Sequence, residues 1–139
     1  MATSQASASW KGNLSEGSGV MRLAKGGYDG PFTKASRFDS GDGTNPEELI
    51  SAAHAGCFSM FLSAILSESG LPPAEIRTTA KVHLGEGPAI TLIELETEAV
   101  VPGCSDSVFL EHADKAKSGC PVSKALGAVP MKLTARLAS

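Results

Sequence analysis

Residues 45–69 read NPEELISAAHAGCFSMFLSAILSES, and this stretch carries the features of one long helix. Asn45 is a favourable N-cap residue, and Pro46 fits the first helical position because its missing N–H is not needed there. Glu48 follows at the third position, where its side chain can complete a capping box with the N-cap residue. The stretch therefore predicts a helix that begins at Pro46.

The same helix is apolar on almost every side. We expect it to end near Ser69, because Gly70 suits the position after the last turn and Pro72-Pro73 block continuation. The apolar part, 49–66, is barely long enough to cross a membrane, and it contains a histidine, a glycine and several serines. An apolar helix of this kind is expected to be a core helix that is buried on all sides, and not a membrane span.

Strand patterns and turn residues flank the long helix on both sides. Before it, the sequence predicts a hairpin of strands 5–14 and 17–25, a loop over 25–31, a weaker strand over 32–38 and a turn over 39–43. After it, the sequence predicts a hairpin of strands 76–84 and 90–101, helices over 106–118 and 120–126, and a last strand over 129–137. This order predicts a single α+β domain over 1–139, with antiparallel sheet packed on helices. Residues 1–9, rich in Ala and Ser, are expected to be loosely held.

The composition excludes several classes of function. The chain has 139 residues, of which 42% are hydrophobic and 5% aromatic, so the expected core is aliphatic. Its net charge of −3 argues against binding to nucleic acid or to an anionic membrane. Residues 1–9 lack the basic start and apolar core of a secretory signal, so we expect a cytoplasmic protein whose thiols are reduced.

Three cysteines offer candidate chemistry. Cys57 lies in the middle of the long helix, where burial would raise its pKa and leave it an inert core thiol unless a cation lies nearby. Cys120 follows Gly119 and precedes Pro121 at the expected N-cap of the short helix, a position that favours thiolate. By this reasoning Cys120 is the better nucleophile, although it could also serve only as a cap. Cys104 is interpreted as an incidental loop thiol.

Other polar side chains could support Cys57. Arg37 could supply the cation and Glu47 could hold it, since guanidinium and carboxylate form bidentate pairs. Alternatively, Arg37 forms a surface ion pair with a nearby aspartate. His54, three positions before Cys57, could form a nucleophile pair with it, but a satisfied core or interface histidine is the favoured interpretation. Nothing else has metal-ligand spacing, so neither a metal nor a cofactor is expected.

Two motifs resemble one known family. Residues 44–49 with 52–60, TNPEEL and AAHAGCFSM, and residues 115–123, KAKSGCPVS, are similar to the OsmC/Ohr family of osmotically inducible and organic-hydroperoxide-resistance proteins, in its OsmC branch. The resemblance covers nearly the whole chain. It implies an OsmC-like α+β fold, with antiparallel sheets around a long central helix, in an intertwined homodimer. It also implies a thiol peroxidase of oxidative or osmotic stress defence that reduces organic hydroperoxides and, to a lesser degree, hydrogen peroxide.

The resemblance further implies a role for each site residue. Cys57 corresponds to the peroxidatic cysteine and Cys120 to the resolving cysteine, which reverses the order of nucleophiles expected from position alone. Arg37 corresponds to the arginine that stabilises the thiolate and Glu47 to the glutamate that orients it. A Cys57–Cys120 disulfide would then need an external dithiol reductant. Two alternatives stay open: a non-catalytic redox sensor or carrier, and an acyl-transfer hydrolase that uses Cys57 with His54.

Overall fold

The computed structural model describes residues 2–138, and the chain divides into two compact units between Leu49 and Ile50. The first unit contains a small sheet and a short helix, and the second contains a larger sheet and most of the helical residues. The expectation of a single domain over the whole chain stays a prediction.

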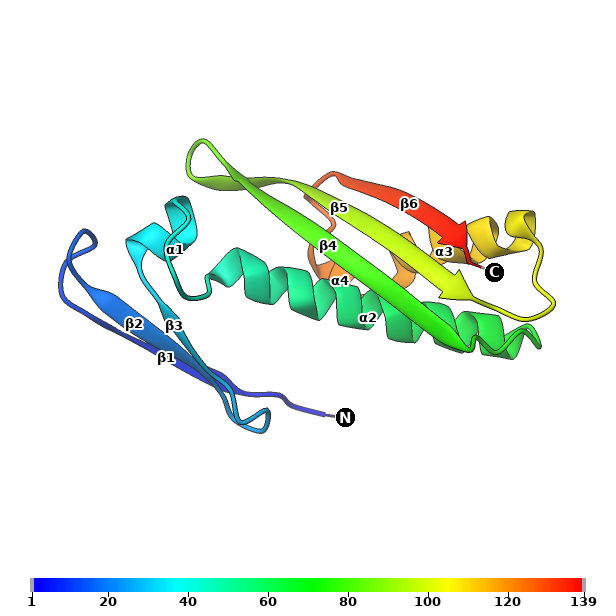
Figure 1. Ribbon diagram of the computed structural model, residues 1–139, viewed down its shortest axis with the longest axis horizontal. Coiled ribbons are helices and arrows are strands. Elements are labelled where there is room, and N and C mark those ends of the chain that lie inside the picture. Colours follow the sequence, from blue (N-terminus) through cyan, green and yellow to red (C-terminus); the bar gives the residue numbers. More distant parts are fainter. Residues whose placement is uncertain (1, 139) are drawn as a thin grey trace. The chain divides into compact units, whose positions relative to one another are not determined.

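The first unit is built on a three-stranded antiparallel sheet in the order β1-β2-β3 (Figure 1, blue to cyan). The strands are β1 (Ala6–Lys11), β2 (Ser18–Leu23) and β3 (Asp29–Phe32). The predicted first hairpin is confirmed, with shorter strands and a longer turn between them. The Trp10 and Phe32 rings pack together with their centroids 5.4 Å apart. Strand β1 is exposed along its whole length.

The strand predicted over 32–38 is wrong, because most of this segment forms helix α1 (Lys34–Phe38). Thr33 is its N-cap, and its hydroxyl accepts a hydrogen bond from the Ser36 N–H at 3.1 Å. The Ser36 hydroxyl in turn accepts one from the Thr33 N–H at 2.9 Å, which completes a capping box. These local bonds stabilise a helical turn that the residue pattern alone does not indicate. Strand β3 instead lies in part of the predicted loop.

Helix α2 (Pro46–Glu68) confirms the predicted long helix. The Asn45 side chain accepts a hydrogen bond from the Glu48 N–H at 2.8 Å, as an N-cap residue should. The Glu48 carboxylate accepts a hydrogen bond from the Thr44 hydroxyl at 2.6 Å. At the other end, Gly70 has a φ of +78°, the left-handed conformation expected directly after a helix.

The second unit contains a three-stranded sheet in the order β4-β5-β6. The elements after α2 are β4 (Glu75–Gly85), β5 (Ala89–Val100), α3 (Asp106–Gly119), α4 (Pro121–Ala125) and β6 (Met131–Leu137). The β4–β5 hairpin is antiparallel as predicted, but β6 pairs with β5 in parallel, which corrects the expectation of antiparallel sheets throughout. Helices α3 and α4 cause this difference, since they form a crossover between β5 and β6 that brings β6 in along the same direction.

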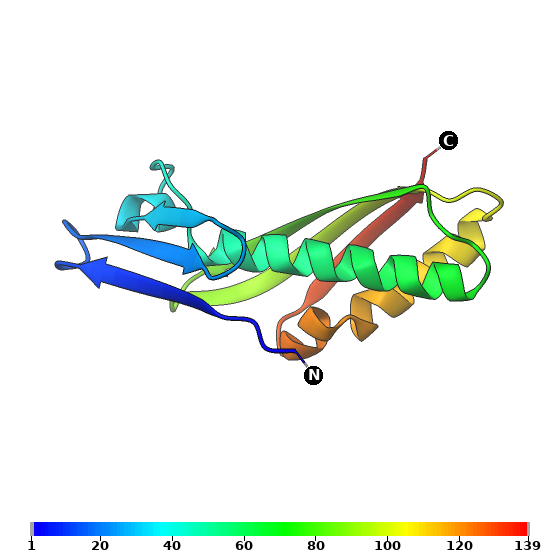
Figure 2. The same ribbon diagram turned by 90° about the horizontal axis from the view of Figure 1, so that it is seen from below.

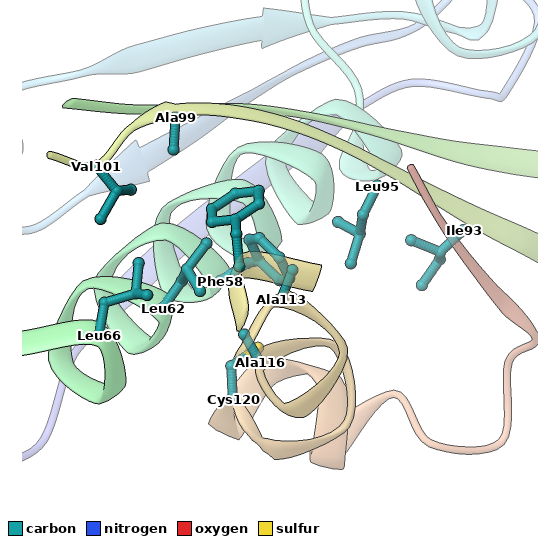
Figure 3. Packing of buried hydrophobic residues seen from close by; sticks show 11 residues of the cluster. Phe58, Leu62, Leu66, Ile93, Leu95, Ala99, Val101, Ala113, Ala116 and Cys120 are labelled. Carbon is teal, nitrogen blue, oxygen red and sulfur yellow. The ribbon is translucent and has the colours of Figure 1, made fainter. Parts of the chain in front are cut away.

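The core of the second unit lies between its sheet and its helices. Helices α2 and α3 lie on the same side of the sheet (Figure 2). Phe58, Leu62 and Leu66 project from α2 toward β5 and α3 (Figure 3). The opposing buried side chains are Ile93, Leu95, Ala99, Val101, Phe109, Ala113, Ala116 and Cys120. Burial of each large side chain stabilises the unit by about 1.5–3 kcal/mol, so this cluster holds α2 in place.

The expectation that α2 is buried on all sides is wrong for the single chain. Its opposite face is exposed, and Met60 retains 77% of its accessible surface. The small residues exposed with it are Ala52, Ala53, Gly56 and Ala64. By length and composition alone, α2 is the one helix among the described residues that could cross a membrane. Its other face, however, packs against the sheet and α3 of the same chain, as in a core helix.

Candidate active site

Arg37 and Glu47 form a bidentate ion pair. Arg37 lies in the last turn of α1 and Glu47 in the first turn of α2. The guanidinium Nε lies 2.9 Å from one carboxylate oxygen, and Nη2 lies 3.0 Å from the other. Glu47 is only 7% exposed, whereas about a third of the Arg37 side chain is exposed. The predicted partnership is therefore present, with a carboxylate that fixes both the position and the orientation of the guanidinium.

Hydrogen bonds to the backbone place these two residues opposite each other. The Ser36 hydroxyl donates to the Thr44 carbonyl at 2.7 Å, and the Asn45 amide donates to the Ser36 carbonyl at 2.9 Å. Both bonds join α1 to the start of α2. The supporting roles of Ser36 and Thr44 were not predicted from the sequence, because they depend on the helix at 34–38 that the strand prediction missed.

The fold brings Cys57 and Cys120 together, although they are far apart in the sequence. Cys57 lies on α2, and Cys120 lies between α3 and α4 with its thiol within hydrogen-bonding reach of Cys57. Cys120 is the N-cap residue of α4, as predicted, and its sulfur accepts a hydrogen bond from the Ser123 N–H at 3.4 Å. The exposures differ from expectation, because Cys120 is fully buried in the core (Figure 3), whereas Cys57 is only partly buried.

The surroundings of Cys57 within the second unit favour its neutral form. Burial raises the pKa of the Cys57 thiol, and the neighbouring Cys120 thiol raises it further through a hydrogen bond and electrostatic repulsion. A backbone hydrogen bond from Val122 acts in the opposite direction and lowers this pKa. The net effect is upward, so a reactive Cys57 needs a cation, as the sequence predicted.

His54 is a core histidine with one nitrogen in use. The side chain is completely buried, and its Nε2 lies 2.7 Å from the Ser123 hydroxyl oxygen. Among residues 2–138 its Nδ1 has no hydrogen-bond partner. Burial lowers the pKa of His54, so the imidazole is neutral near pH 7. The favoured interpretation of His54 as a core residue is confirmed, but it is satisfied at only one of its two nitrogens.

Ser123 is a site residue that the sequence analysis did not identify. Its hydroxyl oxygen contacts both the His54 ring and the Cys120 thiol, which donates to it at 3.1 Å. Ser123 lies three residues after the N-cap cysteine, at a position whose backbone N–H an N-cap side chain can accept, but nothing in the sequence indicated the contacts of its hydroxyl.

Cys104 lies apart from this arrangement. Its thiol donates to the Ser105 carbonyl at 3.4 Å in the turn before α3. Burial raises its pKa, and the adjacent Asp106 carboxylate raises it further. These surroundings suit the interpretation of an incidental loop thiol. Within the described part of the chain, no group of three or more His, Cys, Asp or Glu side chains is placed to hold a metal ion.

Comparison with known sequences points to one family. A family model described as OsmC-like protein matches residues 39–134. The chain is 47% identical over 125 residues to Peroxiredoxin OsmC of Escherichia coli strain K12, covering 87% of each protein. It is 35% identical over 96 residues to the Organic hydroperoxide resistance protein of Xanthomonas axonopodis pv. citri, covering 68% of each.

Solved structures share the fold at much lower sequence identity. An OsmC-like protein of unknown function from Vibrio cholerae has a TM-score of 0.76 at 16% identity, with 97% of this chain and 99% of that chain covered. An OsmC-like protein from Mycoplasma pneumoniae has a TM-score of 0.75 at 14% identity, with 99% of both chains covered. The predicted α+β, OsmC-like fold class is thereby confirmed.

Proposed function

The chain belongs to the OsmC-like protein family, and from this membership we propose that it is a thiol-dependent peroxidase that reduces organic hydroperoxides. Relatives named Peroxiredoxin OsmC and Organic hydroperoxide resistance protein support a peroxidase-type redox role. Hydrogen peroxide is a lesser substrate in this proposal, and the biological setting is defence against oxidative or osmotic stress.

The observation that carries the proposal is the meeting of the Cys57 and Cys120 thiols. A partly exposed thiol beside a buried one suits a peroxidatic and a resolving cysteine, because the first must reach a peroxide and the second only its partner. Cysteines that serve only to fill a core do not need to lie in pairs.

The proposed reaction has three steps. Cys57 thiolate attacks the distal oxygen of the hydroperoxide, the O–O bond breaks, the alkoxide takes up a proton and leaves as the alcohol, and Cys57 becomes a sulfenic acid. Cys120 then attacks the Cys57 sulfur, and a disulfide and water form. Two electrons from an external dithiol restore both thiols. The Arg37 guanidinium, held by Glu47, stabilises the Cys57 thiolate and so offsets the rise in its pKa that burial causes.

The remaining requirements are also proposals. The scheme needs an external dithiol reductant and no resident metal or cofactor. It suits the cytoplasm, where such reductants keep thiols reduced. We further propose that the protein is a homodimer in which a second copy covers the exposed face of α2 around Met60.

Peptide mapping tests the proposed reaction directly. One equivalent of an organic hydroperoxide should remove two free thiols and produce a linked Cys57–Cys120 peptide, detected by mass spectrometry. A Cys57→Ser variant should consume no peroxide, while the matched Cys104→Ser variant should behave as the wild type. Retention of all three thiols, or full activity in Cys57→Ser, would exclude the peroxidase.

The two alternative functions predict different results. An acyl-transfer hydrolase needs His54 to activate Cys57, but the Nε2 atom of His54 contacts Ser123 and its Nδ1 has no partner among the described residues. The geometry therefore gives this alternative no support. A redox sensor would form the same disulfide, but slowly and without turnover when a dithiol is supplied. Steady-state kinetics with excess dithiol separates the sensor from the peroxidase.

A further inference from the structure

Three buried side chains join α2 to the start of α4 in one hydrogen-bonded row. The Cys120 thiol donates to the Ser123 hydroxyl oxygen at 3.1 Å, and that oxygen lies 2.7 Å from His54 Nε2. The exposed fractions are 0% for Cys120, 3% for Ser123 and 0% for His54. The peroxidase scheme above uses the cysteine but leaves the serine and the histidine without a role.

The donors and acceptors available in this row determine which group donates each hydrogen bond. Because the Cys120 S–H donates to Ser123, the single hydroxyl proton of Ser123 can be donated to His54 Nε2. The imidazole then carries its own proton on Nδ1 and offers the Nε2 lone pair as an acceptor. The row thus runs from an acid, the thiol, through a hydroxyl to a neutral base.

The unpartnered Nδ1 argues that this hydrogen-bonded row does more than hold α2 and α4 together. Buried polar side-chain atoms nearly always have a hydrogen-bond partner, but among residues 2–138 His54 Nδ1 has none. The imidazole is therefore held at this depth through Nε2 alone, on the side that faces Ser123 and the thiol. An apolar residue would fill the space without leaving a buried polar atom unpaired.

We propose that His54, acting through Ser123, removes the proton of Cys120 during the step that forms the disulfide. The inference rests on the proposed peroxidase function. Cys120 is fully buried, so bulk water does not reach its proton, and an internal acceptor is needed. As the Cys120 sulfur attacks the Cys57 sulfenic acid, its proton passes to Ser123, and the Ser123 proton passes to His54 Nε2.

The step balances without an outside reagent. The S–S bond forms, the Cys57 S–O bond breaks, and hydroxide leaves. The proton collected by His54 and this hydroxide together make one water molecule. The Cys57 sulfur is reduced and the Cys120 sulfur is oxidised by the same amount. Burial lowers the pKa of His54, which makes the imidazole release the proton again once the disulfide has formed.

Separate rates for the two chemical steps test this role. Samples quenched at successive times after mixing with an organic hydroperoxide are analysed by mass spectrometry for Cys57 sulfenic acid, trapped with a dione reagent, and for the Cys57–Cys120 disulfide. Ser123→Ala should form the sulfenic acid at the wild-type rate but the disulfide on the order of 10²-fold more slowly, so that sulfenic acid accumulates. Ser123→Thr, which keeps a hydroxyl, should restore most of the disulfide rate.

A second variant separates basicity from packing. His54→Gln keeps a side chain that can hydrogen-bond to Ser123 but cannot take up a proton at neutral pH. It should also slow the disulfide step alone, and it tests the proposed proton transfer if Ser123→Ala does not fold. Wild-type disulfide rates in His54→Gln or in folded Ser123→Ala, or an equal slowing of both steps, would overturn the inference. A wild-type protein that forms no Cys57–Cys120 disulfide would instead overturn the proposed function, before any variant is compared.

Discussion

Arg37 and Glu47 show how far a pair of residues can be predicted from sequence. Complementary charge and the preference of guanidinium for bidentate pairing indicated the contact, and the structure contains it. Ser123 could not be predicted in the same way. Its partners His54 and Cys120 come from different parts of the chain, and only the packing of α2 against α4 brings the three together.

Removal of the guanidinium should make Cys57 less acidic. We expect Arg37→Ala to raise the midpoint of the pH–rate profile for peroxide consumption by about one to three pH units, because a nearby cation favours thiolate by that amount. The measurement is the rate of sulfenic acid formation between pH 5 and 10. Arg37→Lys is the matched control, since it keeps the charge but loses the bidentate contact with Glu47. An unchanged profile in Arg37→Ala would show that Arg37 does not act on Cys57.

Burial of His54 should also make stability depend on pH. The pKa of His54 is lowered in the folded chain, so below about pH 6.5 the unfolded chain takes up a proton first. The contribution of His54 to the free energy of unfolding should therefore be fully present above that pH. Below that pH the free energy of unfolding should fall, by at most about 1.4 kcal/mol per pH unit from this group, until the folded-state pKa is reached.

Urea unfolding of the wild type and of His54→Gln at pH 7.5, 6.5 and 5.5 measures this contribution. All other titrating groups are shared, so the difference between the two proteins isolates His54. The wild type should lose more stability than the variant on acidification. Parallel pH dependence in the two proteins would mean that His54 titrates alike in the folded and unfolded chains.

At the scale of elements, the longest helix and the longest hairpin were predicted correctly from local signals, whereas a five-residue helix and the direction of one strand were not. The start and end of α2 and the β4–β5 hairpin follow from caps, turns and alternation that are all present locally. The segment 32–38 was mistaken for a strand because its helix depends on the reciprocal bonds of Thr33 and Ser36. The parallel pairing of β6 was missed because alternation along a strand does not indicate its direction.

Asn45 serves both as the cap of α2 and as a link to α1. Its Oδ1 accepts from the Glu48 N–H, and its Nδ2 donates to the Ser36 carbonyl. We expect Asn45→Ala to lower the free energy of unfolding by about 1 kcal/mol relative to Asn45→Ser, which keeps a capping oxygen. Denaturant titration followed by circular dichroism gives both values. Equal stability of the two variants would mean that the cap contributes nothing. A lower free energy of unfolding in Asn45→Ser than in the wild type would measure the contribution of the hydrogen bond to the Ser36 carbonyl.

For the whole molecule, the sequence predicted a helix that is apolar on every side, but the single chain buries only one side of it. Composition can show that the surface of a helix is apolar, but it cannot show whether that surface is covered by the same chain or by another. In addition, every buried hydrophobic side chain of the described core belongs to the second unit. Both features favour the proposed homodimer, since a second copy would supply apolar cover that this chain does not supply to itself.

Met60 is the residue on which this proposal is most easily tested. A methionine that is 77% exposed on the monomer and buried in the dimer should contribute about 1.5–3 kcal/mol per copy to association. We expect Met60→Glu to raise the dimer dissociation constant at least about tenfold, and more if the two copies act additively. Leu110→Glu is the matched control, because Leu110 is also exposed, at 50%, but lies on a different helix, α3. Sedimentation equilibrium over a range of protein concentrations gives the dimer dissociation constants of the wild type and of both variants. A monomeric wild type, or equal effects of the two substitutions, would mean that the exposed face of α2 is not where the copies meet.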